Sequence, residues 1–209
     1  REIPAGRIEI KDAIGFTAIS CLAFLFSAAM LGRLCFFLAI PVLLLLCSYS
    51  YAKRFTWLTH LYLGMVIGLA PVGAWVAAAK VFSPGVLWLS IALTFYIAGF
   101  DVLYACQDTQ FDRSTGLHSI PARFGVAAAL KTAAAFHGIA FLGFIFFGLI
   151  MDLSWPYAVT VLLIGILMIV EHRMVHPDDL SKINIAFFHM NSAISITLIA
   201  GVVADTLWR

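Results

Sequence analysis

Charged residues are scarce in this sequence. Asp, Glu, Lys and Arg make up 11% of its 209 residues, whereas apolar residues make up 63%. A soluble globule of this size needs far more polar surface, so the composition excludes a soluble domain and predicts an integral membrane protein. The formal net charge is only +2. Because so small a charge gives little attraction for phosphate backbones, we predict no nucleic-acid partner.

Cysteine motifs are also lacking. None of the four cysteines has a partner at the CxxC spacing that is typical of zinc and redox sites. Most of them lie inside apolar runs, which predicts buried thiols rather than disulfides or zinc ligands. They are Cys21, Cys35, Cys47 and Cys106.

Long apolar runs are what the sequence has in abundance. A transmembrane helix needs about 17 to 25 predominantly apolar residues. Seven windows fit, although the second is short unless Tyr49, Ser50 and Tyr51 extend it into the membrane interface. We therefore predict an all-α fold: a polytopic transmembrane helical bundle forming one domain over residues 1–209, without repeats or a separate soluble domain. The windows are 13–31, 34–48, 58–79, 86–105, 127–150, 157–174 and 186–207.

Basic residues are divided unevenly between the two sides of this predicted bundle. Of the 13 Lys and Arg residues, only Arg33, Lys80 and Arg209 fall on one side. The positive-inside rule makes the other side cytoplasmic, so polar groups near its loops are predicted to face the cytoplasm. The residues on that side are Arg1, Arg7, Lys11, Lys53, Arg54, Arg113, Arg123, Lys131, Arg173 and Lys182.

Three carboxylates lie at the end of the fourth apolar run. On a continuous helix, the offsets between Asp101, Asp108 and Asp112 bring all three within roughly 40° of one another, so they are predicted to share one face. A solvated polar loop would explain Arg113 and His118, but not Asp101, which lies inside the helix, where an unpaired acid costs a few kcal/mol. Crowded carboxylates need cations, protons or a positively charged partner.

The Asp108 and Asp112 pair is typical of half of a metal–diphosphate clamp. Mg²⁺ prefers oxygen ligands and often binds one or two carboxylates together with water and phosphate oxygens. Such a clamp would stabilise a diphosphate leaving group. Lys53 and Arg54 could reach a phosphate, but simple anchoring at the membrane interface explains them equally well.

Several other small and polar residues are explained by helix packing or by the membrane interface rather than by function. Small residues four apart at Gly64 and Gly68 predict close helix packing, and Pro71 predicts a kink. Several histidines lie near predicted helix ends and are interpreted as interface residues. Three polar residues near the last helix could line a cavity, although bonds to neighbouring backbone explain them better. The histidines are His60, His137 and His172, and the last three residues are Asn184, His189 and Asn191.

Several motifs together resemble one family. The pattern Asp-x-x-Tyr-Ala-x-x-Asp-x-x-x-Asp from Asp101, followed by Ser-x-Pro-x-Arg-Phe-Gly at 119–125, resembles the second aspartate-rich motif of the UbiA superfamily of intramembrane aromatic prenyltransferases. Residues 49–56 resemble its basic segment, and 63–75 the helix that follows. The start, Arg1-x-Ile-Pro-Ala-Gly-Arg-Ile, is similar to the tail of the family's first aspartate-rich motif. These versions look closest to bacterial 4-hydroxybenzoate polyprenyltransferases of ubiquinone and menaquinone pathways.

The resemblance implies nine transmembrane helices and two aspartate-rich motifs that bind Mg²⁺ and a polyprenyl diphosphate together. Seven helices are predicted here, and the first motif should precede Arg1. We therefore expect the printed chain to lack two helices and half of the metal site. One hypothesis is accordingly that this polypeptide is inactive by itself. The resemblance also places the protein in a bacterial inner (plasma) membrane.

The resemblance assigns a role to each candidate residue. Asp108 and Asp112 would bind Mg²⁺, and Lys53 and Arg54 would bind the diphosphate. Catalytic roles fall to Asp101, which would stabilise the allylic cation or accept a proton, and to Tyr104, which would stack on or hydrogen-bond to a substrate. Arg123 is a candidate partner for the carboxylate of 4-hydroxybenzoate. An apolar groove among membrane lipids would hold the polyprenyl tail.

Two alternative functions remain open. A related enzyme could use the same diphosphate machinery with a naphthoate, protoheme or chlorophyllide acceptor. A small cation or solute transporter could instead use the three Asp residues to bind its cargo. A transporter predicts carboxylates near the middle of the membrane, whereas these lie toward one end of a span.

Overall fold

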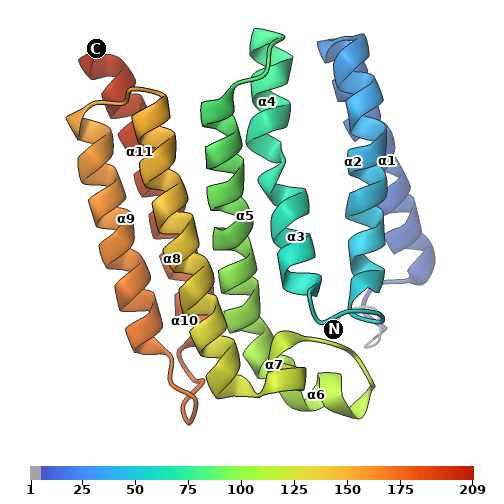
Figure 1. Cartoon of the computed structure of the whole chain (residues 1–209). Coiled ribbons are helices and arrows are strands. Elements are labelled where there is room, and N and C mark those ends of the chain that lie inside the picture. Colours follow the sequence, from blue (N-terminus) through green and yellow to red (C-terminus); the bar gives the residue numbers. More distant parts are fainter. Residues whose placement is uncertain (1–5) are drawn as a thin grey trace.

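The computed structural model describes residues 6–209. Within them, all the secondary-structure elements longer than an isolated bridge are helices (Figure 1). The sequence similarity at Arg1 and Pro4 lies outside the described residues. Seven helical spans in the described part are long and apolar enough to cross a membrane, which confirms the predicted all-α bundle, including its uncertain second span. They are Ile10–Leu31, Arg33–Ala52, Thr59–Ala79, Pro84–Ser114, Val126–Ile150, Trp155–Met174 and Ile183–Trp208.

Several spans are built from more than one helical element. The single-helix spans are α1 (Ile10–Leu31), α2 (Arg33–Ala52), α8 (Val126–Ile150) and α9 (Trp155–Met174). The composite spans are α3 (Thr59–Gly68) with α4 (Ala70–Ala79); α5 (Pro84–Ala105) with the 3₁₀ turn η1 (Cys106–Asp108) and α6 (Thr109–Ser114); and α10 (Ile183–Ile185) with the π-helical η2 (Ala186–Met190) and α11 (Asn191–Trp208). A short helix, α7 (Ile120–Phe124), precedes α8.

Proline explains the break in the third span. The α3 helix ends at Gly68, and α4 begins at Ala70 with Pro71 in its first turn. A proline lacks the N–H that an uninterrupted helix needs, but it is tolerated in a first turn. The predicted kink at Pro71 is therefore confirmed.

The α5 helix occupies the centre of the molecule, with α3 on one side and α8 on the other (Figure 1). Small residues allow this close packing. A Cβ added to Gly64 would collide with the carbonyl oxygen of Thr94, and one added to Gly143 would lie 2.8 Å from the Cβ of Ala92. Glycine interfaces of this kind are common between membrane helices, because association there depends on close packing.

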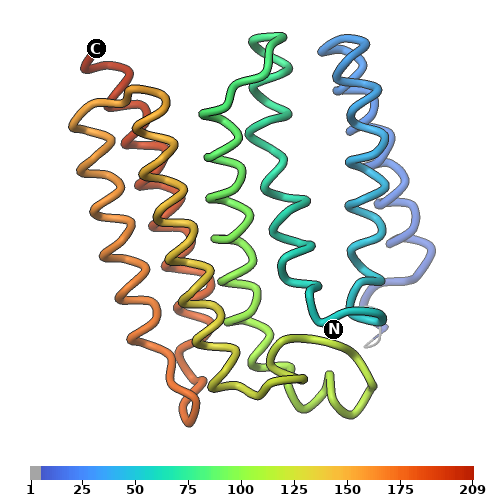
Figure 2. The backbone as a smooth tube through the Cα atoms, viewed as in Figure 1, coloured from blue at the N-terminus to red at the C-terminus, as the bar shows by residue number. Residues whose placement is uncertain are grey.

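The α1–α2 hairpin packs far less tightly than the centre. It lies on the far side of α3 and α4 from α5 (Figure 2). Ala28 and Ala39 are its buried residues within the described chain. An apolar cavity of about 440 Å³ lies between this hairpin and α3–α4, with residues such as Ala39, Val66 and Gly73 in its wall.

The two ends of the bundle differ in the length of their connections. The longer ones join α2 to α3, α6 to α8 and α9 to α10, and they gather at the lower end in Figure 1. The opposite end carries the short turns after α1, α4 and α8. The predicted division of the loops between two sides is confirmed, and the elaborated end is the one that holds the carboxylates.

Candidate functional site

The carboxylate segment is not one continuous α-helix. The α5 helix ends at Ala105, η1 occupies the next three residues, and α6 begins at Thr109. A 3₁₀ turn advances about 120° per residue instead of about 100°. The continuous helix used to place Asp101, Asp108 and Asp112 on one face is therefore wrong, and the first and last of these carboxylates have different partners.

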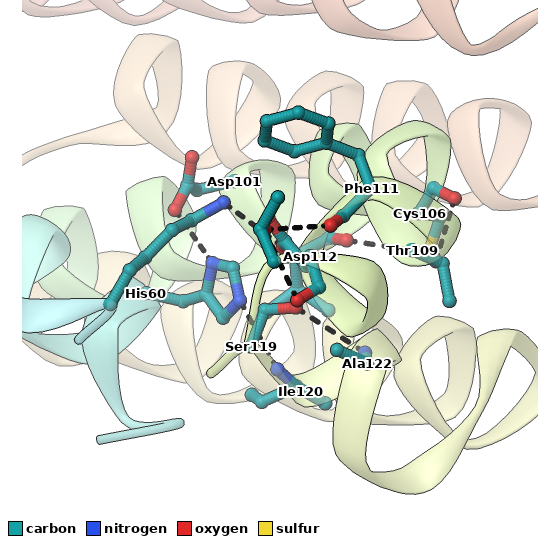
Figure 3. A network of polar contacts seen from close by, with 12 residues as sticks. His60, Asp101, Cys106, Thr109, Phe111, Asp112, Ser119, Ile120 and Ala122 are labelled. Atoms are coloured by element: carbon teal, nitrogen blue, oxygen red, sulfur yellow. Dashed lines mark hydrogen bonds and ion pairs between the residues drawn. The ribbon is translucent and has the colours of Figure 1, made fainter. Parts of the chain in front are cut away.

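Asp101 is paired with a histidine from α3. His60 Nδ1 lies 2.7 Å from Asp101 Oδ2, and the histidine side chain is 0% exposed (Figure 3). On the other side of the ring, Nε2 accepts a hydrogen bond of 3.4 Å from the backbone N–H of Ile120. Because Nε2 accepts, the proton of a neutral ring is on Nδ1 and is donated to Asp101.

The interpretation of His60 as an interface residue is wrong. The residue precedes Gly64 by one helical turn and Gly68 by two, so it lies on the face of α3 that packs against α5. This spacing is the signal that could have identified it. Its partner is 41 residues away in sequence, however, and no local motif joins the two.

Asp112 is completely buried and forms an ion pair with Lys53. The distance from Lys53 Nζ to Asp112 Oδ2 is 3.2 Å, and the side chains are 26% and 0% exposed, respectively. The second carboxylate oxygen, Oδ1, is buried and has no hydrogen-bond partner in the described part of the chain. Such an oxygen is well suited to a hard cation, because Mg²⁺ prefers carboxylate ligands and a buried unpaired oxygen is costly.

Backbone hydrogen bonds hold the surrounding loop in place. Lys53 accepts a bond of 2.7 Å from the N–H of His118, and the carbonyl of Asp112 accepts one of 2.8 Å from Leu117. Ser119 caps the short α7 by accepting from Ala122 at 3.3 Å. The loop thereby joins the α2–α3 connection to α6.

The remaining predicted site residues lie around this centre. Asp108 is half-buried at the end of η1, and the half-buried Tyr104 packs on Phe187 with ring centroids 4.3 Å apart. The exposed guanidinium groups lie over aromatic rings: that of Arg54 is 5.4 Å from the Tyr51 centroid, and that of Arg123 is 5.6 Å from the Trp57 centroid. The structure thus brings Lys53 to a carboxylate but directs the two arginines toward aromatic side chains.

Known proteins resemble the chain over most of its length. The model of the UbiA prenyltransferase family matches residues 1–193. A 4-hydroxybenzoate octaprenyltransferase from Nitrosomonas europaea is 29% identical, over 100% of this chain and 71% of that protein. A mitochondrial 4-hydroxybenzoate polyprenyltransferase from Arabidopsis thaliana is 31% identical, over 75% of this chain and 39% of that protein.

A solved structure agrees with these relatives. The apo structure of a UbiA homologue from Aeropyrum pernix K1 superimposes with a TM-score of 0.86 at 32% identity, covering 97% of this chain and 75% of the homologue. By sequence and by fold, the chain belongs to the UbiA prenyltransferase family.

Proposed function

We propose that this protein transfers a polyprenyl group from a polyprenyl diphosphate to 4-hydroxybenzoate in a quinone biosynthetic pathway. The names of the Nitrosomonas and Arabidopsis relatives support this donor and this acceptor. In the reaction, the bond between the prenyl carbon and the diphosphate oxygen breaks. A bond then forms between that carbon and the aromatic ring, and the ring loses one proton.

The observation that carries the proposal is the buried Asp112 beside Lys53. Its Oδ1 atom has no partner in the described chain, and its Oδ2 atom faces an ammonium group 3.2 Å away. In the proposed enzyme, Asp112 and Asp108 would hold Mg²⁺, which would neutralise part of the charge of the diphosphate. Lys53 and Arg54 supply further positive charge, and Lys53 is exposed enough to turn toward a phosphate.

Asp101 serves the acceptor side in this proposal. Its carboxylate stabilises the developing allylic cation or accepts the proton that the ring or phenol loses. His60 holds the carboxylate in one orientation through the bond of 2.7 Å. Tyr104 contacts a substrate ring, and Arg123 binds the carboxylate of 4-hydroxybenzoate.

The apolar cavity between α1–α2 and α3–α4 is proposed to hold the prenyl tail. Its volume is about 440 Å³ and its lining is apolar, which suits a hydrocarbon chain in contact with lipid. The positive-inside rule supports a site that faces the cytoplasm, because most basic residues lie in the loops at the carboxylate end. A bacterial inner membrane is the corresponding location.

The decisive experiment is a transfer assay in lipid vesicles with radiolabelled polyprenyl diphosphate. The protein is assayed with 4-hydroxybenzoate, dihydroxynaphthoate, haem and chlorophyllide, with Mg²⁺ or with EDTA. We expect Mg²⁺-dependent labelling of 4-hydroxybenzoate. Labelling of another acceptor instead would overturn the proposed substrate, and labelling that persists in EDTA would overturn the metal requirement.

The same vesicles test the transporter hypothesis. If the vesicles show cation flux that depends on Asp112 and show no prenyl transfer, the protein is a transporter rather than an enzyme. If the protein binds the diphosphate but labels no acceptor, the hypothesis that this polypeptide is inactive by itself is confirmed.

A further inference from the structure

A second polar cluster lies on the opposite side of α5 from Asp101. His137 of α8 meets Glu171 and His172 of α9, and one ligand atom from each lies within 4.8 Å of the others. His172 Nε2 is 2.9 Å from His137 Nδ1, and Glu171 Oε2 is 3.4 Å from the same nitrogen. The interpretation of His137 and His172 as interface residues is wrong, because His137 is buried and both belong to this cluster.

Glu171 is a buried carboxylate without a hydrogen-bond partner. Its side chain is 0% exposed, and neither oxygen accepts a hydrogen bond from any described residue. A charge in this position costs several kcal/mol unless a cation or a proton neutralises it. The prenyltransferase mechanism proposed above makes no use of this residue, so it needs another explanation.

The orientation of the His137 ring favours a positive centre shared with Glu171. Its Nε2 atom lies 3.2 Å from the backbone oxygen of Tyr96, which can only accept. In a neutral ring the proton is therefore on Nε2, and the lone pair of Nδ1 faces both His172 Nε2, 2.9 Å away, and Glu171 Oε2, 3.4 Å away. The hydrogen bond from His172 leaves the carboxylate without a donor, so Nδ1 and Oε2 repel each other until a metal ion or a proton lies between them. A ligand histidine in metalloproteins commonly donates its other N–H to a backbone carbonyl in this way.

Close packing keeps this ring in position. A Cβ on Gly99 of α5 would lie 2.5 Å from His137 Nε2, so only glycine allows the ring to approach the helix. The Tyr96 ring stacks on the same imidazole, with centroids 5.3 Å apart. The cluster therefore has the fixed orientation that a metal site requires.

The spacing of the donor atoms suits a transition metal. Tetrahedral Zn²⁺ with ligands at about 2.0–2.1 Å places neighbouring donors roughly 3.4 Å apart. The distance between Glu171 Oε2 and His137 Nδ1 already equals this, the distance between His172 Nε2 and His137 Nδ1 is 2.9 Å, and all three ligand atoms lie within 4.8 Å of one another. A groove of about 490 Å³ between α8 and α9 is lined in part by both histidines.

We propose that His137, Glu171 and His172 bind one first-row transition-metal ion of the Zn²⁺, Co²⁺ or Ni²⁺ class. Two imidazoles and one carboxylate select such ions over Mg²⁺, which prefers oxygen ligands. The ion neutralises Glu171 and ties α8 to α9. Through the Tyr96 carbonyl and Gly99, the site also adjoins α5, the helix that carries Asp101.

Cobalt binding to the complete protein in detergent tests the proposal. The protein is stripped with a chelator, kept in excess Mg²⁺ and titrated with Co²⁺, and Zn²⁺ is then added in competition. We expect visible d–d absorption that saturates at one equivalent and disappears with Zn²⁺. Glu171→Gln and His172→Asn should each weaken Co²⁺ binding by more than about 100-fold, because each removes a direct ligand, and even supporting residues account for 10- to 100-fold.

Two matched controls separate this site from others. Asp112→Asn alters the other carboxylate site, and His176→Gln removes an exposed histidine from the α9–α10 loop, so both should leave Co²⁺ binding unchanged. Wild-type protein should also gain thermal stability from one equivalent of Zn²⁺, and this measurement does not depend on the folding of a variant.

Two results would overturn the proposal. One is the absence of a saturable Co²⁺ spectrum, and the other is equal Co²⁺ affinity of the wild type and both ligand variants. A wild type that binds no ion, together with a Glu171→Gln variant of unchanged stability, would identify a protonated Glu171 instead.

Discussion

The α5 helix separates two acidic clusters that differ in how their charge is balanced. On the α3 side, Asp101 is paired with His60 and Asp112 with Lys53. On the α8 side, Glu171 has no hydrogen-bond partner within the described chain. Gly99 and Asp101 are two residues apart, about 200° around the helix, so one helix meets both neighbours.

This contrast indicates that the two clusters serve different ions. The first combines carboxylates with an ammonium group at the end of the bundle that carries the long loops, where a diphosphate and Mg²⁺ could enter together. The second offers two imidazole nitrogens and one carboxylate beside an apolar groove. Nitrogen ligands favour a transition metal. Changes to one cluster should therefore leave the chemistry of the other intact.

The largest expected effect comes from Asp112→Asn. The change removes the charge of the proposed Mg²⁺ ligand and leaves Lys53 without its ion pair. We expect kcat/KM for prenyl transfer to fall by at least about 1000-fold, comparable to the loss of a major group stabilising the transition state. Steady-state transfer assays measure this loss, and equilibrium binding of a prenyl diphosphate with Mg²⁺ should fail in parallel.

Asp179→Asn is the matched control for that variant. Asp179 lies in the α9–α10 loop, and hydrogen bonds from Ser181 lower its pKa, so the substitution also removes a negative charge at neutral pH. Transfer should be unchanged. Equal losses in the two variants would mean that overall charge, rather than the buried site, accounts for the effect.

Asp101→Asn should separate binding from chemistry. Because Asp101 is assigned to the acceptor side, the variant should retain most of its diphosphate affinity while kcat falls by about 100-fold, within the range for a proton-transfer group. Single-turnover assays and diphosphate titrations measure the two quantities. A loss of diphosphate binding as large as that of Asp112→Asn would contradict the division of roles.

The carboxylates of the first cluster could be singled out from the sequence, whereas their partners and the whole second cluster could not. The carboxylates of 101–112 fall in one short segment that interrupts apolar sequence, and a short segment stays together however it folds. His60 and Lys53 come from outside this segment, and the 3₁₀ turn that rotates Asp112 has no clear sequence signal. The seven spans followed from hydropathy, because lipid requires long apolar helices.

The second cluster needed the fold before it could be recognised. His137 and His172 are 35 residues apart, and no local motif joins them. Only the packing of α8 against α9 brings them together, and Gly99 of a third helix sets the ring position. Hydrophobic periodicity identifies each helix, but it does not determine which turns of two helices meet.

Gly99→Ala should disturb the second cluster only by changing the packing around His137. The added methyl group would meet the His137 ring, which is confined by Tyr96, and overpacking of this kind costs about 1–3 kcal/mol. Thermal unfolding in detergent should show the lower stability, and one equivalent of Zn²⁺ should restore less of it than in wild type. Gly138→Ala is the control, because a Cβ there would meet nothing within 4 Å. Equal destabilisation by both would show that helix flexibility, not contact with the histidine, determines the result.

His60 variants give the smallest expected effect and test whether the first cluster depends on orientation. His60→Asn keeps an N–H donor near the place of Nδ1, whereas His60→Leu removes it and leaves Asp101 without this partner. We expect kcat to fall about tenfold in the leucine variant, or about 1.4 kcal/mol, and to recover substantially in the asparagine variant. The KM for the diphosphate should stay nearly constant in both, because His60 acts only through Asp101. If His60 acts only in folding, both variants should instead lose the same amount of active enzyme, and the asparagine variant should show no recovery. That result would mean that the His60–Asp101 pair stabilises the α3–α5 interface and does not position the carboxylate for catalysis.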